Sequence, residues 1–376
     1  MTDAAVKRRI LIGCYFPRSV ELEGVGSLLF GLARSMASRA WHVDLLLPDG
    51  AYTVPPGVGL SMYVPGFAGL SRYRAKLRSM SAGTDAVLLL ENNPNMAASA
   101  NASLNTANTF SFFCTPLQTL RLLAELGPTR QAVAHALFKH ILWARLIDWS
   151  RLRCIVGSRY QADQLAALGA GNVHMMPVCG LSRDACVPDR ASARSIMGWD
   201  DKPTVGYLGH FSPAKGVGVL LEAFAEVCDG AVLAIAHSGK GTLKPAHARM
   251  LDKMLSAGRA RLLSTVDPVV FLAACDVVAL PYITTSIFHQ PQVLLESFAA
   301  STPVITTSIG GFGELVRPQV TGALVPPRDS AALAAAISDM TSDLDGSREK
   351  GRAARLVFEQ SFCTESFIDA FSGLIK

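Results

Sequence analysis

Three polar residues in the second half of this 376-residue chain have side chains suited to bind a ligand that carries phosphate and hydroxyl groups. Lys215 and His210 share one short segment, GHFSPAKG at 209–216, which we expect to join a strand to a helix. A lysine beside a helix start can neutralise a diphosphate, because its charge adds to that of the free N–H groups there. A histidine can also donate to phosphate, although it carries only part of a charge near pH 7. Lys215 and His210 are therefore candidates for stabilising a departing diphosphate.

The third residue, Glu296, belongs to the stretch FHQPQVLLESFAASTPVITTSIGG at 288–311. We expect a helix at 293–300, because Pro291 suits a first helical turn. A β-branched strand is expected to follow at 304–307. Glu296 would lie about one turn into the helix, where its carboxylate can accept hydrogen bonds from hydroxyl groups such as those of a ribose. The start of the same helix suits a phosphate group.

Both residues also have plain structural interpretations. Lys215 considered alone is an exposed loop lysine, and Glu296 considered alone is a glutamate on a helix surface. The neighbours of Glu296 include Leu295 and Phe298, so the helix is largely apolar. A carboxylate buried in such a helix needs a partner or a ligand. The combination of Lys215 with Glu296 favours a ligand site.

The expected elements alternate between strands and helices in both halves of the chain. The first half begins with a buried strand at 10–16, a glycine-containing loop at 17–26, a helix at 27–40 and a strand at 41–47. The second half begins the same rhythm with a strand at 204–208. Repeated βαβ units predict parallel sheets, so the fold class is α/β with two Rossmann-like domains.

Strand ends and glycine spacing narrow the class of ligand. Thr265, Val266 and His237 follow strands of the second half, and ligands of open α/β sheets bind at the carboxyl ends of strands. These residues are candidates for a nucleobase pocket. The glycines of the first loop lack the spacing of the dinucleotide fingerprint, and no acidic residue ends the second strand. A nicotinamide-dependent dehydrogenase is therefore disfavoured.

The 288–311 stretch resembles the nucleotide-sugar signature of the retaining glycosyltransferases of family four, the glycosyl transferases group 1. The positions that match are Glu296, Ser301-Thr302-Pro303, Val304-Ile305, Gly310-Gly311 and Glu314, and Lys215-Gly216 matches a second family motif. The resemblance implies the GT-B fold, two Rossmann-like domains facing a central cleft. It further implies a hexosyltransferase-type enzyme that takes a nucleotide-diphosphate sugar, retains the anomeric configuration, and needs neither cofactor nor metal.

The resemblance, together with polar and irregular stretches, sets the expected domain limits. We expect an N-terminal acceptor-side domain at 1–185, a linker at 186–200 and a C-terminal nucleotide-sugar-binding domain at 201–358. The C-terminal helix, about 360–376, is expected to pack back on the first domain, as in other chains of this fold.

The resemblance also assigns roles within the site. It implies that backbone amides of the loop at 289–293 contact the diphosphate and the sugar, except at Pro291, which has no N–H. The glycines at 24 and 26 resemble the family's N-terminal glycine loop, and the acceptor is expected near them and near Asn92-Asn93. Lys215, His210 and Glu296 are then the candidate catalytic residues. The candidate donor-binding residues are Gly24, Gly26, Ser212, Thr265, Val266, His289, Gln290, Pro291, Gln292, Val293 and Glu296.

The chain departs from the family pattern at three places. Phe288 replaces the first glutamate of the signature, and His210 stands where an arginine is usual. Cys114 or Thr115 occupies the strand end at which many members carry a histidine. Phe288 either fills core or shapes a pocket for an unusual sugar. These departures leave an alternative open, in which the protein is a catalytically weak or inactive GT-B module that binds a nucleotide sugar or a protein partner.

Composition excludes other classes of protein and indicates a location. Half of the residues are hydrophobic, yet no run of eighteen apolar residues predicts a membrane span. The eight cysteines include no CxxC pair, which favours reduced thiols in the cytoplasm and no metal site. The net charge of +5 is mild and gives no reason to expect a nucleic-acid partner. The basic segment SRYRAKLRSM at 71–80 is either a solvated helix face or a peripheral contact with the inner face of the membrane.

Overall fold

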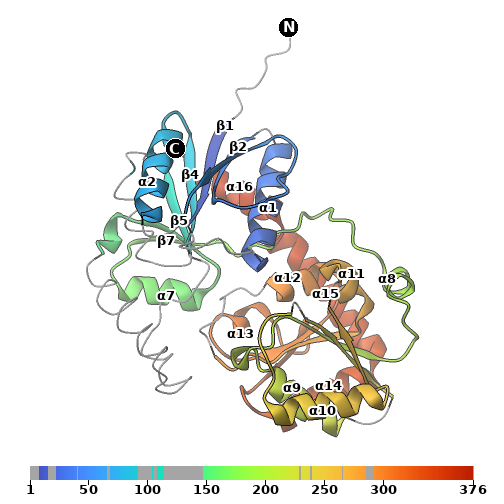
Figure 1. Ribbon diagram of the computed structural model, residues 1–376. Helices are drawn as coiled ribbons and strands as arrows, with labels where there is room; N and C mark the ends of the chain where they lie inside the picture. Colours follow the sequence, from blue (N-terminus) through green and yellow to red (C-terminus); the bar gives the residue numbers. More distant parts are fainter. Residues whose placement is uncertain are drawn as a thin grey trace. The chain divides into compact units, whose positions relative to one another are not determined.

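The computed structural model describes residues 8–15, 23–39, 41–65, 68–91, 104, 108–113, 147–227, 230–237, 239–264, 266–284 and 292–375. The chain divides into two compact units (Figure 1). Unit 1 comprises Met1–Ser182 and Cys363–Lys376, and unit 2 comprises Arg183–Phe362. The division precedes the linker expected at 186–200, and that segment instead contains the helix α8 (Arg190–Met197) of unit 2.

Two ion pairs with a buried carboxylate explain why α8 belongs to unit 2. Arg194 Nη2 lies 2.5 Å from one carboxylate oxygen of Asp276, and Arg190 Nε lies 2.7 Å from the other. The backbone N–H of Thr204, at the start of strand β8 (Thr204–Leu208), donates to the same carboxylate at 2.8 Å. The two arginines give this segment the polar composition of a linker, and only the folded chain shows that their partner is buried.

The described strands of unit 1 form one parallel sheet in the order β3-β2-β1-β4-β5-β6-β7. Their bounds are β1 Arg8–Cys14, β2 Trp41–Pro48, β3 Val58–Tyr63, β4 Ala86–Glu91, β5 Thr109–Phe113, β6 Arg153–Val156 and β7 Asn172–Met175. The described helices of this unit are α1 Glu23–Ser38, α2 Gly69–Ser81, the short 3₁₀ turn Trp149–Arg151, α7 Arg159–Ala167 and α16 Thr364–Ser372. The expectation of a parallel sheet is confirmed for this unit.

Helix α1 begins earlier than expected, so Gly24 and Gly26 lie in its first turn and not in a loop. The loop was expected because glycine is a poor helix former. Val25 is buried like Leu29 and Leu32, which lie one and two turns farther along the same face, and this apolar stripe carries the helix through the glycines.

The C-terminal segment, expected to return to the first domain, forms α16 within unit 1. The hydroxyl groups of Ser35 and Thr364 lie 2.7 Å apart in a buried contact between α1 and α16. Phe371 packs edge-on against Phe110 of β5, with ring centroids 4.9 Å apart. Arg153 Nη2 donates to the backbone oxygen of Leu374 at 2.8 Å. The last helix therefore contributes to the core of unit 1.

Unit 2 contains a second parallel sheet, in the order β10-β9-β8-β11-β12-β13. The other strands are β9 Val232–Ala236, β10 Ala260–Leu263, β11 Val277–Leu280, β12 Val304–Thr307 and β13 Gly322–Val325. Beyond α8, its described helices are the 3₁₀ turn Pro213–Lys215, α9 Val217–Glu226, α10 Pro245–Ser256, α11 Pro268–Ala274, α12 Gln292–Ala299, α13 Phe312–Leu315, α14 Ser330–Ser342 and α15 Leu344–Ser361. Both units are thus Rossmann-like, as the sequence predicted.

Helices cover both faces of the second sheet. Val205 of β8 belongs to one core cluster with Leu221 of α9, Leu251 of α10 and Ile337 of α14. The next residue, Gly206, points to the opposite face, because side chains alternate along a strand. A Cβ at Gly206 would lie 2.5 Å from Cys275 Sγ, directly after α11, so the polypeptide packs closely there.

The order of the strands identifies the place where a ligand should bind. β8 lies between β9 and β11, because the chain runs outward from β8 to β10 and then returns to continue on the other side. The loops that follow β8 and β11 therefore diverge, and open α/β sheets bind ligands in the crevice that such loops leave.

Candidate functional site

The loop after β8 contacts the segment after β11 at this point of divergence. Gly216, which precedes α9, has φ +71°, and a Cβ there would lie 1.8 Å from the backbone oxygen of Pro281. The N–H of Ile283 donates to the oxygen of Ala214 at 3.0 Å. The positive φ and the close approach explain the requirement for glycine after Lys215. The two loops are held together as one structure.

Lys215 folds back toward the end of β8. A Cβ built on Gly209, the first residue after that strand, would lie 3.0 Å from Lys215 Nζ and 3.4 Å from its Cδ. The ammonium group therefore lies over Gly209, and the backbone of Lys215 directly precedes Gly216, the N-cap of α9. The structure thus places the lysine at the carboxyl end of a central strand, where its charge adds to that of a helix N-terminus.

Tyr207 holds the turn that carries His210 and Ser212. Its hydroxyl donates to the backbone oxygen of His210 at 2.8 Å. Burial, reinforced by Tyr282, raises the pKa of Tyr207, so the hydroxyl remains a donor. The N–H of Ser212 donates to the same oxygen at 2.9 Å, and the oxygen of Ser212 accepts from Lys215 N at 3.0 Å. Tyr207 could not be identified from the sequence, because in a buried strand a tyrosine cannot be distinguished from ordinary core.

A flat aromatic pair lies at the ends of β8 and β9. The rings of Phe211 and His237 are stacked, with centroids 3.8 Å apart and planes 12° apart. The backbone oxygen of Lys240 accepts from Phe211 N at 3.0 Å and lies 2.9 Å from His237 Nε2, which must then carry the proton. His237 was expected near a base pocket, whereas Phe211 was not identified. Val266, after β10, is half-buried in the same unit.

Glu296 is buried within α12. It is 7% exposed and lies between Leu295 and Ser297, which have no exposed surface. The Ser297 hydroxyl donates back to the oxygen of Val293 at 2.6 Å, one turn nearer the start of the helix. A buried carboxylate this close to the helix N-terminus is favoured by the helix dipole. Glu296 is therefore not the surface glutamate of the plain interpretation.

Two threonine hydroxyls connect β12 to the segment after β11. Thr306 donates to the oxygen of Leu280 at 2.9 Å, and Thr307 donates to that of Tyr282 at 2.7 Å. The ring of Tyr282 packs against Phe312 at the start of α13, with centroids 4.8 Å apart. Thr306 and Thr307 of the 288–311 stretch thus fix the segment after β11 to strand β12.

Not all of the predicted site residues can be placed together. Seven of them belong to unit 2 and lie after the carboxyl ends of its strands, either in the next loop or in the first part of the next helix. They are His210, Ser212, Lys215, Val266, Gln292, Val293 and Glu296. Gly24 and Gly26 belong to α1 of unit 1. Thr265, Phe288, His289, Gln290, Pro291, Cys114 and Thr115 lie outside the described residues.

Two further properties concern the described residues as a whole. Within the part of the chain that the structure describes, no group of three or more His, Cys, Asp or Glu side chains could hold a metal ion. In the same part, no helix combines the length and the apolar character needed to cross a membrane.

Comparison with known proteins finds a family match within unit 2. Residues 202–343 match the family described as glycosyl transferases group 1. A D-inositol 3-phosphate glycosyltransferase from Mycobacterium sp. (strain KMS) is 34% identical over 199 residues, which are 50% of this chain and 45% of that protein. The chain spans about half the length of the curated relatives it matches.

Solved structures extend the likeness to both units. Sucrose-phosphate synthase from Thermosynechococcus elongatus has a TM-score of 0.76 at 20% identity, over 98% of each chain. HepE from Anabaena, in complex with UDP and glucose, has a TM-score of 0.72 at 19% identity, over 98% of this chain and 99% of that one. At such identities the likeness establishes the fold, which is the expected GT-B fold. The chain thus has the GT-B fold, and residues 202–343 of its second unit match the glycosyl transferases group 1 family.

Proposed function

We propose that this protein is a hexosyltransferase-type glycosyltransferase, which moves a sugar from a nucleotide-diphosphate sugar to an acceptor hydroxyl. The observation that carries the proposal is the position of Lys215 at the carboxyl end of β8, beside the start of α9. The match to glycosyl transferases group 1 covers this loop and Glu296 together. The curated relatives are glycosyltransferases by name, and HepE was solved with UDP-glucose.

The donor diphosphate would lie between the loop after β8 and the start of α12. Lys215 and His210 would carry the charge that develops on the leaving diphosphate, and free N–H groups at the helix start would add to it. Glu296 would accept hydrogen bonds from ribose hydroxyls. Tyr207 would act through the backbone of His210, by keeping the turn in place. Val266, and Thr265 beside it, would line the base pocket.

We further propose transfer with retention and without a divalent metal. In this reaction the acceptor oxygen bonds to the anomeric carbon on the face that the diphosphate leaves. The acceptor proton passes to a diphosphate oxygen as the old bond breaks, so no protein nucleophile is needed. Because Lys215, His210 and the helix N-terminus supply the positive charge, turnover should be unchanged by EDTA, and the product anomer should match that of the donor.

The acceptor would be a glycolipid, a polysaccharide or a small molecule in the cytoplasm, and unit 1 carries a surface suited to the membrane. Leu60, Met62 and Val64, on and just after the edge strand β3, are 36%, 39% and 55% exposed. Helix α2 adds the exposed Arg72 and Arg78. The Lys76 ammonium donates to the oxygen of Met62 at 2.9 Å, so the basic helix and the apolar strand form one surface. We propose that it contacts anionic lipids at the inner face of the membrane.

Lipid vesicles test this contact. Sedimentation with vesicles containing phosphatidylglycerol should recover the protein, and vesicles of phosphatidylcholine alone should not. The paired substitutions Leu60→Ser and Met62→Ser should reduce recovery without lowering the melting temperature. Equal recovery with both vesicle types would remove the electrostatic part of the proposal.

A donor screen tests the central proposal. UDP-, GDP- and ADP-sugars should raise the melting temperature, whereas NAD should not, because binding to the folded state stabilises it by mass action. The best donor is then incubated with candidate acceptors, and released nucleoside diphosphate is measured against Lys215→Ala. Stabilisation by NAD alone would contradict the proposal. Binding of a donor without release of nucleoside diphosphate in the presence of any acceptor would instead indicate a module that binds the nucleotide sugar without transferring it.

A further inference from the structure

Unit 2 contains a pocket at the end of the sheet opposite to the candidate donor site. It has a volume of about 420 Å³, within the range of small-molecule sites. Asp276 precedes β11 and Pro303 precedes β12, so the pocket lies at the amino ends of these strands. The donor loops follow the carboxyl ends. A strand of four residues separates the two sites by about 13 Å.

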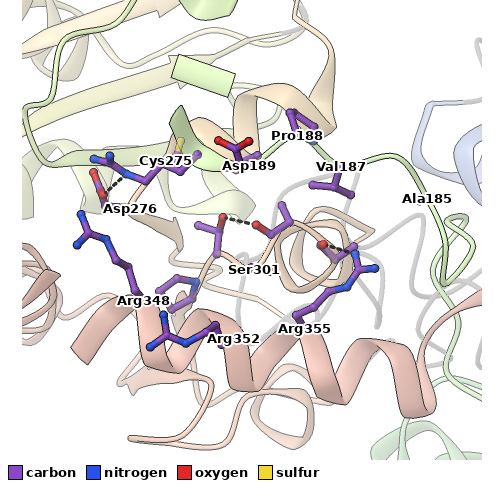
Figure 2. A pocket seen from close by; sticks show the side chains of 16 residues that line it. Ala185, Val187, Pro188, Asp189, Cys275, Asp276, Ser301, Arg348, Arg352 and Arg355 are labelled. Carbon is purple, nitrogen blue, oxygen red and sulfur yellow. Dashed lines mark hydrogen bonds and ion pairs between the residues drawn. The ribbon is translucent and has the colours of Figure 1, made fainter. Parts of the chain in front are cut away.

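The pocket has an apolar wall and a basic wall. Ala273, Ala299 and Pro303 form part of the apolar surface, and Val187 and Pro188 add to it. Arg348 and Arg352 rise from α15, which packs against Pro303, and Arg355 lies farther along the same helix (Figure 2). These positions share one helix face because they are four and three residues apart.

Most of the other charged groups in the pocket are already engaged. Asp276 is held by Arg190, Arg194 and the N–H of Thr204. Asp189 caps α8, accepting from the N–H of Ser192 at 3.0 Å and from its hydroxyl at 2.9 Å. Both aspartates among the lining residues are therefore committed to the fold.

Arg355 is likewise structural. It donates to the backbone oxygens of Ala299 and Arg183 at 2.6 and 2.7 Å and pairs with Glu359 at 2.6 Å. It thereby closes the carboxyl end of α12, where a cation is favourable.

Arg348 and Arg352 differ from Arg355, because their partners are weak. Arg348 is 47% exposed and pairs with Asp345, which is 91% exposed. Arg352 is 67% exposed, and its nearest carboxylate, that of Glu349, is 3.9 Å away. Exposed pairs of this kind contribute little, so a ligand can replace them. Neither Asp345 nor Glu349 lines the pocket. Two guanidinium groups are thus held beside an apolar wall without a committed partner in it.

We propose that this pocket is a second small-molecule site, which binds a compact phosphomonoester such as a sugar phosphate. The phosphate would be held by Arg348 and Arg352, whose planar forks suit its oxygens. The uncharged body would pack against Ala273, Ala299 and Pro303. The site is separate from the donor site and does not depend on Lys215 or Glu296.

Calorimetric titration with glucose 6-phosphate tests the proposal. The double substitution Arg348→Ala with Arg352→Ala should weaken binding at least about tenfold, because each removes a charge-assisted contact. Lys350→Ala removes a cation from the same helix but not from the lining, and should change affinity less than about twofold. Lys215→Ala should likewise leave this affinity unchanged. Hydrogen exchange should show protection at 185–190 and 344–355 on addition of the sugar phosphate.

Four results would overturn the assignment. If Lys215→Ala abolishes binding, the sugar phosphate occupies the donor site. If inorganic phosphate binds as tightly as glucose 6-phosphate, the apolar wall contributes nothing to the affinity and the pocket binds only an anion. Absence of binding at millimolar concentration, or full affinity in the double variant at an unchanged melting temperature, would remove the site altogether.

Discussion

Lys215→Ala should weaken every ligand that carries a diphosphate and spare the corresponding nucleoside. The side chain folds over Gly209, with Nζ 3.0 Å from the position a Cβ would take there. The ammonium is thus held at the carboxyl end of β8. In that place it can reach a phosphate on the sheet edge, whereas the ribose is expected at Glu296 on α12.

The magnitude follows from the kind of contact that is lost. A hydrogen bond to a charged group contributes about 1.5–3 kcal/mol. Removal of the ammonium should therefore raise the Kd of UDP or GDP about 10- to 100-fold, since each 1.4 kcal/mol is about tenfold. The lower end is expected because Lys215 is only half-buried and water can take its place. Uridine or guanosine should change less than about twofold, because neither carries the phosphates.

Titration calorimetry with the preferred diphosphate and its nucleoside measures both effects. Lys202→Ala is the matched control, because Lys202 is a lysine of the same unit with a 59% exposed side chain. Gly209→Ala provides a second perturbation, since its methyl group would lie 3.0 Å from Lys215 Nζ and displace it slightly, and would also strain a backbone with φ +157°. It should show a smaller loss with the same selectivity. If diphosphate and nucleoside weaken equally in Lys215→Ala, the lysine supports the loop and the phosphate assignment is refuted.

Three other variants test the site and the fold. Glu296→Gln should raise the Kd of the nucleotide about tenfold or more at an unchanged melting temperature, and unchanged affinity in calorimetry would remove the ribose role. Asp276→Ala should lower the free energy of unfolding, measured by urea denaturation, by about 3–5 kcal/mol, because it leaves Arg194 buried without its carboxylate. The control Asp200→Ala, at an exposed ion pair, should lower the same free energy by less than about 1 kcal/mol. Deletion of residues 363–376 removes Phe371 from the core of unit 1. Scanning calorimetry should then show loss of the unfolding transition of unit 1, while that of unit 2 persists. Two unaltered transitions would contradict the packing of α16.

The class of the fold could be derived from the sequence because its signals are local. The expected strands at 204–208 and 304–307 have the bounds of β8 and β12, and the helix expected at 293–300 is α12 shifted by one residue. Short apolar strands alternating with amphipathic helices leave a parallel sheet as the natural arrangement. The start of α1 was placed too late, since glycine propensity was outweighed by the burial of Val25.

The residue types of the candidate site were also visible in the sequence, but their geometry was not. The pair Lys215-Gly216 is a local motif, and its glycine is explained by the approach of Pro281. The tether from Tyr207 to His210 and the stack of Phe211 on His237 join groups at the ends of neighbouring strands. Strand neighbours are set by the order of the sheet, which periodicity along the chain does not encode.

The sequence by itself therefore determined the α/β class, the order of the elements and the chemical types at the donor loops. Tertiary structure decided which charges are buried and which remain available. Arg194 and Arg348 look alike in the sequence, yet one is 3% exposed and paired with Asp276, whereas the other is 47% exposed at the edge of a pocket. The physical reason is that the cost of burying a charge depends on partners supplied by distant segments.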